Sequence, residues 1–236
     1  MKRQGGITVL VSYEREIEMF SALLKRARRV RIDGKKALRG SLYGRDVMVL
    51  FLGEGRSMPP DPAVRDAELV ISTGICGGLS SSLRCGDIVV AEKVLFLDAQ
   101  GKREVLTGTG TMSLQSLEVP ESAGAFRLLS NGRSCMPFQT VHGKTVTVEK
   151  PLLLAAEKRK VGEKTGGISV DMEDFFRLEA ARRLSAHFLS IRAVYDEASL
   201  DIRPEEGHLD ATRLMLSSES IAGALSLVIE ADLNFA

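Results

Sequence analysis

The stretch Glu68–Ala99, ELVISTGICGGLSSSLRCGDIVVAEKVLFLDA, decides the fold. Its first residues, Glu68–Ser72, form an apolar run that predicts a strand buried on both faces, and Asp87–Leu97 predicts a second, longer strand. Between them, Thr73–Gly78 is a glycine-rich loop that lets the backbone turn tightly. This loop has neither the GxGxxG spacing of a dinucleotide site nor the Lys-Ser/Thr pair of a phosphate-binding loop.

The chain on the N-terminal side continues the alternation of strand and helix. Ile7–Val11 predicts another buried strand, and residues 14–29 have helical apolar spacing with acids first and bases last. The basic run Lys25–Arg31 is then the solvated end of that helix. Leu38–Tyr43 and Asp46–Leu52 predict two antiparallel strands joined at a turn.

The C-terminal third follows the same pattern, after a loop-rich excursion at Asp98–Arg133. The expected elements are a helix at Pro151–Lys160, a strand at Gly167–Val170, a helix at Glu173–Leu184, a strand at His187–Val194 and a helix at Asp210–Leu233. Strands separated by helices predict an α/β fold, a mixed and mostly parallel sheet flanked by helices, in a single domain over residues 1–236.

Composition excludes several classes of protein. The 236 residues carry 32 Lys+Arg against 31 Asp+Glu, a net charge of +1, which argues against a nucleic-acid partner. Cys76, Cys85 and Cys135 are odd in number and form no CxxC pair, so we expect no disulfide framework, no metal and a cytoplasmic location. The apolar runs are too short for a signal peptide or a membrane span.

Polar residues follow each predicted strand, at the edge where parallel sheets bind ligands. They include Glu14 and Glu16, the glycine-rich loop, Asp171–Asp174 and Asp196. Acids in a first helical turn usually serve the helix dipole, and the single residues His142, His187 and His208 are best explained as structural or surface groups. Because no Cys/His pair stands at this edge, the inventory suits acid/base chemistry on a neutral polar ligand.

Three segments in the same order resemble the purine nucleoside phosphorylase and nucleosidase superfamily. They are the quoted stretch Glu68–Ala99, the segment SVDMEDFFRLEAARRLSAHFLSIRAVYDEA, and the N-terminal ITVLVSYEREIEMF. They are similar to the branch that cleaves 5′-methylthioadenosine and S-adenosylhomocysteine. The Gly-Ile-Cys-Gly-Gly-Leu and Val-Asp-Met-Glu motifs look more like the hopanoid-associated branch, which releases adenine from adenosylhopane.

The resemblance implies roles for individual residues. Glu16 would be the base that activates water, and Asp196 would protonate the purine at N7. Glu173 would bind the ribose hydroxyls while Met172 packs against the sugar. The backbone of the remaining substrate-binding positions would approach the ribose and the nucleophile; these are Gly74, Ile75 and Gly77. The resemblance implies no cofactor and a homodimer or larger homo-oligomer.

The chemistry of glycosidic cleavage agrees with these roles. Breaking the C1′–N9 bond places positive charge on the sugar and negative charge on the base, so it needs a carboxylate beside the one and an acid beside the other. Asp196 must then hold a proton near pH 7, although the usual pKa of Asp is about 3.9. Burial against Phe188, Ile191 and Val194, or the neighbouring Glu197, would raise that pKa.

Water is favoured over phosphate as the nucleophile. Related phosphorylases carry Ser or Thr where this chain has Ile75, and the acidic turn around Glu16 repels a phosphate dianion. Arg56 and Arg84 keep a phosphate-dependent phosphorylase as the alternative, and a catalytically inactive nucleoside-binding protein is the second alternative.

The sequence departs from the family pattern in three places. Tyr195 stands where the family usually has Ser, and the helix between Gly55 and Glu68 is shortened and rich in proline. The base-stacking segment falls around Thr145–Val148, without an aromatic residue. An apolar substituent on the nucleoside would need a groove, for which Phe51, Phe175 and Phe176 are candidates, although core packing is their more common fate.

Overall fold

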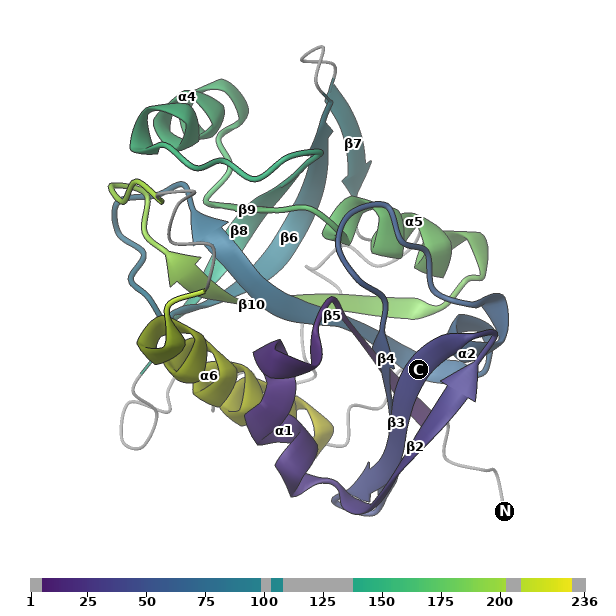
Figure 1. The fold of residues 1–236 in the computed structure, drawn as a ribbon. Helices are drawn as coiled ribbons and strands as arrows, with labels where there is room; N and C mark the ends of the chain where they lie inside the picture. The colour runs from purple at the N-terminus through teal and green to yellow at the C-terminus, as the bar shows by residue number, and fades with distance from the viewer. Residues whose placement is uncertain (1–5, 99–102, 108–137, 203–208, 231–236) are drawn as a thin grey trace, which may run out of the picture.

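The computed structural model describes residues 6–98, 103–107, 138–202 and 209–230 (Figure 1). Its strands are β1 (Gly6–Val11), β2 (Lys25–Ile32), β3 (Lys35–Leu42), β4 (Arg45–Phe51), β5 (Ala67–Gly78), β6 (Ile88–Leu97), β7 (Arg103–Thr107), β8 (Thr140–Val148), β9 (Ser169–Asp171) and β10 (His187–Asp196). Its helices are the 3₁₀ turn η1 (Glu14–Ile17), α1 (Glu18–Leu23), α2 (Asp61–Arg65), α4 (Ala155–Thr165), α5 (Asp174–Arg183) and α6 (Ala211–Glu230).

One mixed sheet connects all the described strands, in the order β10-β6-β8-β9-β5-β1-β4-β3-β2, with β7 paired to β6. An additional pairing of β10 with β5 closes the first five strands of this order into a ring. Helix α6 lies along one side of the sheet with α1, and α5 lies on the other (Figure 1). The expected fold class is confirmed. That residues 1–236 form one domain stays a prediction, since both ends of the chain lie outside the described residues.

The glycine-rich segment is a strand, which corrects the expected loop. β5 runs on through Thr73–Gly78, because β10 pairs with it in parallel over this length, from Ile191 opposite Thr73 to Asp196 opposite Gly77. Pairing with β10 along this length, and with β9 at Gly77 and Gly78, holds the segment in the sheet. The consequence for the site is that polar groups of β10 and β5 lie in register.

The basic run Lys25–Arg31 is also not a helix end. The helix expected over residues 14–29 stops at Leu23, and the run forms the edge strand β2, paired only with β3 among the described strands. Most side chains of β2 are exposed, while Val30 and Ile32 pack against a buried cluster around Leu50. Charged side chains on an edge strand prevent it from pairing with other chains. The same charges look like the solvated end of a helix in the sequence, and for this reason the helix prediction was wrong here.

β8 has no counterpart in the sequence-based expectations. It lies parallel to β6, and Val146 and Val148 alternate with the buried Thr145 and Thr147, but the residues His142–Lys144 before them interrupt the alternation that marks a strand. The expected excursion Asp98–Arg133 contains the strand β7, and its other parts from 99 to 102 and from 108 onward lie outside the described residues, as do Cys135 and His208. The helix expected at Pro151–Lys160 starts later, as α4 at Ala155.

Helix α6 packs one face against the sheet. Its apolar residues Ile221, Leu225 and Val228 belong to the largest buried cluster, together with Phe20 of α1. Within the described residues, α6 also has the length and apolar composition of a membrane span, with a mean hydropathy of 1.2, but 50% of that window is buried inside the protein. These contacts are those of a helix that covers a core.

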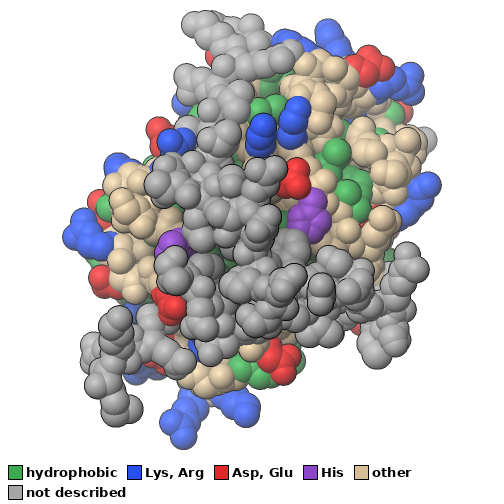
Figure 2. All heavy atoms as spheres, turned by 180° about the vertical axis from the view of Figure 1, so that it is seen from behind, with side chains coloured by type: hydrophobic (Ala, Val, Ile, Leu, Met, Phe, Trp, Pro, Cys, Tyr) green, Lys and Arg blue, Asp and Glu red, His purple; other side chains and the backbone are tan. Residues whose placement is uncertain are grey.

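Surface charge is mixed in sign. On the face seen in Figure 2, the described Lys and Arg side chains alternate with Asp and Glu around the rim and do not gather into one basic patch. This distribution agrees with the near-zero net charge.

Candidate functional site

Glu16 enters the site from η1, directly after the carboxyl end of β1. Its side chain is buried, and its Oε2 accepts a hydrogen bond of 3.2 Å from the Tyr13 N–H. A Cβ at Gly74 would lie 2.9 Å from Glu16 Oε2, and Gly74 has a φ of +139°. Only glycine adopts that backbone freely while leaving room for the carboxylate, so η1 and β5 approach closely here.

Arg192 joins three carboxyl groups at this point. From β10, its Nη1 donates to Glu173 Oε2 at 3.0 Å and to the Ile75 carbonyl at 3.2 Å, and its Nη2 donates to Asp174 Oδ1 at 2.6 Å. Asp171 lies within 3.9 Å of Nε. Arg192 was not among the residues predicted from the sequence. A charged residue inside the apolar strand HFLSIRAV was nevertheless a signal, since a buried charge needs a partner of opposite charge.

The pKa values of the two aspartates beside Arg192 shift in opposite directions. Burial would raise the pKa of Asp174, but the positive charge of Arg192 and hydrogen bonds from Arg192, Ser190 and Ser72 outweigh it and lower that pKa. Burial raises the pKa of Asp171 to about 8, with Asp174 adding to the effect. The ionised Asp174 and Glu173 therefore hold Arg192.

Burial also raises the pKa of Glu16, to about 7. Arg192 opposes this rise, whereas the negative charge of Glu173 adds to it. A carboxyl group with such a pKa exchanges its proton near neutral pH, which is the property of a general base.

Asp196 lies at the other end of the site, where β10 ends opposite Gly77. A Cβ at Gly77 would lie 3.2 Å from Asp196 Oδ2. Gly77 lies three residues beyond Gly74 along the strand, a span of about 10 Å. Glu16 and Asp196 thus border the same stretch of β5 from its two ends.

Asp196 forms an ion pair with the buried Lys158 of α4. Burial raises the pKa of Asp196, and Lys158 opposes the rise. The sequence also predicted a raised pKa for Asp196, but it did not predict all the neighbours of this carboxyl group. Val194 is buried nearby in sequence, Phe188 packs in other clusters, and the cation was not foreseen.

The other predicted binding residues lie on β5 or next to Glu173. Ile75 contributes its carbonyl to Arg192, as above, and Met172 packs at the edge of the apolar cluster of Leu79 and Val146. Glu173 is buried at the start of α5, and its Oε1 accepts a 3.3 Å hydrogen bond from the Gly55 N–H. The loop after β4 therefore reaches Glu173. As expected, the helix that follows this loop is short, α2 having five residues.

Several other candidates point away from the site. Glu14 pairs with Arg29 on the surface, and the Tyr195 hydroxyl accepts from the Asp210 N–H. Phe175 and Phe176 pack against Phe96, with ring centroids 5.1 and 5.3 Å from it, so these rings belong to a core cluster. They do not line the apolar groove considered above.

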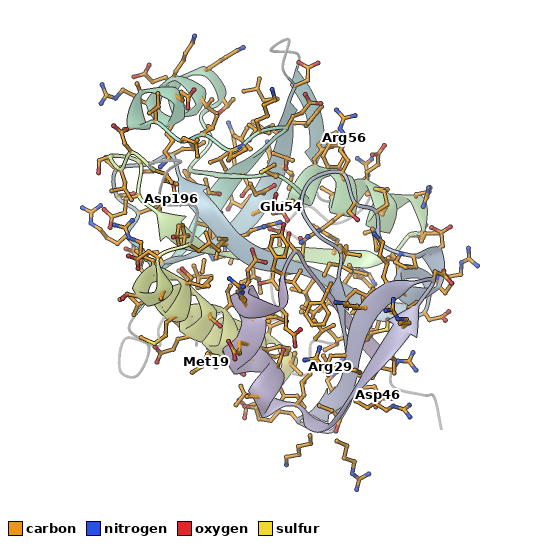
Figure 3. The ribbon with its side chains drawn as sticks, viewed as in Figure 1. Met19, Arg29, Asp46, Glu54, Arg56 and Asp196 are labelled. Atoms are coloured by element: carbon orange, nitrogen blue, oxygen red, sulfur yellow. The ribbon has the colours of Figure 1, made fainter. Side chains whose placement is uncertain are left out.

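Tyr13 and Glu54 stand at the outer side of the Glu16 and Glu173 carboxylates. The Tyr13 hydroxyl is hydrogen-bonded to Glu54, and the charges of Glu54, Glu16 and Glu173 each add to the rise in its pKa after burial. Glu54 neighbours Gly55, which contacts Glu173 (Figure 3). No sequence signal identified this pair.

Basic side chains near the site already have partners. Arg56 pairs with Glu149 and lies over the Phe96 and Phe176 rings. Arg84 lies 3.8 Å from Glu197. Arg177 is buried and donates to Ser12, Ser72 and the Leu10 and Thr73 carbonyls. Within the described parts of the chain, no His, Cys, Asp and Glu cluster is arranged to hold a metal ion.

The chain is similar in sequence and in fold to known nucleosidases. The chain is 26% identical over 206 residues to a 5′-methylthioadenosine/S-adenosylhomocysteine nucleosidase of Lysinibacillus sphaericus, covering 82% of this chain and 76% of that protein. Its fold matches the nucleosidase of that name from Neisseria meningitidis, solved with methylthio-immucillin-A, with a TM-score of 0.76 at 19% identity, covering 96% of this chain and 99% of the other.

A second solved structure, the S-adenosylhomocysteine nucleosidase of Streptococcus pyogenes with 5-methylthiotubericidin, matches with a TM-score of 0.72 at 18% identity and covers 97% of each chain. These relatives agree with the expectation of a nucleosidase. The family model described as the phosphorylase superfamily matches residues 7–229. A match over that length confirms the resemblance of the three motifs: the chain belongs to the phosphorylase superfamily.

Proposed function

We propose that the protein is a purine-nucleoside N-ribohydrolase, which cleaves the N-glycosidic bond of a 5′-substituted adenosine and releases adenine. The observation that carries this proposal is the placement of carboxyl groups at both ends of one stretch of β5: Glu16 and Glu173 around Gly74, and Asp196 beside Gly77. The spacing of about 10 Å suits a nucleoside lying along the strand.

In this proposal the two ends divide the work. Glu16, with its pKa of about 7, takes a proton from water as the water attacks C1′. Glu173 accepts hydrogen bonds from the ribose hydroxyls, and Met172 packs against the sugar. Asp196 gives its proton to N7, and the electron pair of the C1′–N9 bond leaves with the base. The backbone of Gly74, Ile75 and Gly77 borders the sugar.

Hydrolysis is favoured over phosphorolysis because the basic groups at this site are occupied. Arg192 and Arg177 bond to groups of the protein, and Arg56 and Arg84 each face a glutamate. A phosphate dianion at Gly74 would also meet Glu16 and Glu173. Repulsion at such short range outweighs the attraction of an arginine that is already paired.

The 5′ substituent is the open part of the proposal. Because Phe175 and Phe176 are part of a core cluster, support for a long apolar substituent of the adenosylhopane type is weaker than the sequence suggested. The exposed Tyr13–Glu54 pair next to Glu173 favours a substituent with hydrogen-bond donors or a small one, of the adenosylhomocysteine or methylthioadenosine type. We also propose a cytoplasmic location, because the three cysteines are odd in number and form no CxxC pair.

Base release from a nucleoside panel tests the proposal. The panel holds adenosine, methylthioadenosine, adenosylhomocysteine, inosine and an adenosine with a long 5′-alkyl group, each in phosphate-free buffer and again with phosphate. We expect free adenine without phosphate. Turnover only with phosphate would establish the phosphorylase instead, and binding without turnover would establish a nucleoside-binding protein.

We further propose that the protein is a homodimer or larger. Exposed apolar side chains gather on the adjacent helices α1 and α6, namely Met19, Leu23 and Met215 (Met19 is labelled in Figure 3). Apolar side chains grouped on one surface mark association sites. Light scattering of the purified protein would give the mass, and a monomer at micromolar concentration would contradict the proposal.

A further inference from the structure

Lys158 is a fully buried lysine, at 0% exposure, on the inner face of α4. Burying an ammonium group is costly unless its charge is paired and its donors are satisfied. Lys158 meets both conditions. Its Nζ pairs with the Asp196 carboxylate and donates to the Glu197 carbonyl at 3.2 Å and the Leu200 carbonyl at 2.9 Å.

These contacts fix the ammonium in place. The two carbonyls belong to the turn that follows β10, so Lys158 ties α4 to that turn and to the end of β10 at once. An ammonium group has three N–H donors, and here three acceptors are present. The ammonium therefore has little freedom to leave Asp196.

The same contacts fix the Asp196 carboxyl group. Oδ2 contacts Lys158, and both oxygens border the space over Gly77, where a Cβ would lie 3.2 Å from Oδ2 and 3.4 Å from Oδ1. Holding Oδ2 leaves Oδ1 to face a ligand lying along β5.

We propose that Lys158 is a positioning residue that acts through Asp196: it holds one carboxylate oxygen so that the other faces the purine, and it stabilises the carboxylate that remains after the proton has moved to N7. This inference rests on the proposed function. In the step itself, the O–H bond of Asp196 breaks, an N7–H bond forms, and the electron pair of C1′–N9 leaves with adenine. The product carboxylate lies against the Lys158 ammonium.

Other groups facing Asp196 do not replace this charge. Arg213 of α6 acts on it at longer range and in the same direction as Lys158. Cys76 of β5 is a buried thiol whose pKa is raised well above its usual value, and the Tyr195 pKa is also raised, so both are neutral. Glu197 turns its carboxylate toward Arg84. Lys158 is thus the cation in direct contact.

The proposal has two consequences of opposite sign. Without Lys158, the carboxylate left by proton transfer is less stable, so Asp196 is a weaker acid and kcat falls. The pKa of Asp196 rises at the same time, so the group keeps its proton to higher pH. A purely structural lysine would lower kcat or stability without moving the pH limit.

The test compares K158M with K158R in the full chain. For K158M we expect kcat at the optimum to fall about tenfold or more, and the alkaline limb of the kcat profile to move up by about one pH unit or more. For K158R, which keeps the charge, the limb should stay where it is in the wild type. A limb unchanged in K158M, or moved equally in both variants, overturns the proposal. Should K158M not fold, K158Q takes its place, and K158R still decides by its limb.

A second measurement separates this inference from the proposed function. The carbon-13 shift of the Asp196 carboxyl, followed against pH without substrate, should titrate about one unit higher in K158M than in the wild type. It requires no turnover. If the titration moves but the wild type releases no base, the proposed function fails and the Lys158–Asp196 coupling stands. If base is released but the titration does not move, the inference is wrong.

A double variant closes the argument. With D196N as the background, adding K158M should change kcat by less than about threefold, because Lys158 then has no carboxylate to act on. A further loss as large as that of K158M alone would show a role independent of Asp196 and contradict the proposal.

Discussion

The two ends of the site differ in how many carboxyl groups contact a buried cation. At the end around Gly74, one arginine, Arg192, faces three carboxyl groups, while Glu16 stands beside them. At the end around Gly77, one lysine, Lys158, faces one carboxyl group, Asp196. The first end holds four carboxyl groups against two buried arginines, and the second holds one carboxyl group against one lysine; the four are Glu16, Asp171, Glu173 and Asp174, and the arginines are Arg192 and Arg177.

This difference matches the charges that glycosidic cleavage would create. The negative charge of Glu173 at the Gly74 end favours a sugar that becomes positive, and fixed groups in a buried site need no rearrangement to do so. A balanced pair at the Gly77 end releases a proton without leaving an isolated buried charge. The asymmetry between the ends is therefore a property that experiments can break one end at a time.

Replacing Glu16 with Gln should have the largest effect. Loss of the base should lower kcat by about a thousandfold, within the range for general base catalysis. The assay is base release with the best nucleoside of the panel. Activity of E16Q within about threefold of the wild type would exclude Glu16 as the base.

The same variant should gain stability at high pH. The pKa of Glu16 is about 7 in the folded protein against 4.5 as the reference, so the wild type loses stability as pH rises through this window, when the unfolded chain ionises first. E16Q lacks this loss. We expect it to be more stable by about 1–3 kcal/mol at pH 8, with no gain at pH 4. Urea unfolding at the two pH values measures it, and an equal gain at both would contradict the pKa assignment.

Breaking either cation should show which end is more demanding. R192M leaves Asp174, Asp171 and Glu173 without their shared partner and should cost about 3–5 kcal/mol of unfolding free energy. K158M strands a single carboxyl group, which takes up a proton instead, so it should cost less. Urea unfolding at pH 7 ranks the two variants. A larger loss in K158M would reverse the comparison.

The sequence predicted most of the elements that carry this site. Apolar runs identified β1, the first half of β5, β6 and β10, because strands covered on both faces have an unmistakable composition. The rule that ligands bind at strand ends included Glu16, Glu173 and Asp196 among several acids, and the family resemblance then selected these three, which lie at the two ends of one stretch of β5 in the structure.

What escaped prediction depended on contacts between distant segments. The strand character of Thr73–Gly78 comes from its pairing with β10, more than a hundred residues away. β2 was not predicted as a strand, because its charged residues continued the helical pattern of the preceding segment. Lys158 lies among charged residues of α4 that look alike in sequence, and only the position of Asp196 makes it different.

Replacing one glycine at each end with alanine compares the two ends through smaller effects. G74A places a Cβ at a backbone φ of +139° and 2.9 Å from Glu16 Oε2, so we expect a loss of about 1–3 kcal/mol in stability together with lower activity. At Gly77 the backbone is ordinary, and the new Cβ would press on Val170 Cγ1 at 3.0 Å and Asp196 Oδ2 at 3.2 Å, so for G77A we expect activity to fall about tenfold with a smaller change in stability. G6A, whose Cβ would have contacts of 3.6 Å and more, is the control. Equal stability losses in G74A and G77A would show that strain at Gly74 is not the cause.

The smallest effect is expected where a cation is exposed. Arg29 and Glu14 form an ion pair on the surface, with side chains 71% and 47% exposed, and water screens their attraction. R29A should therefore leave both kcat and the melting temperature, within about 1 °C, unchanged. Thermal unfolding of R29A beside R192M measures the contrast directly. A clear loss in R29A would mean that Glu14 supports the neighbouring Glu16 turn, and that the Gly74 end draws on charge outside the buried cluster.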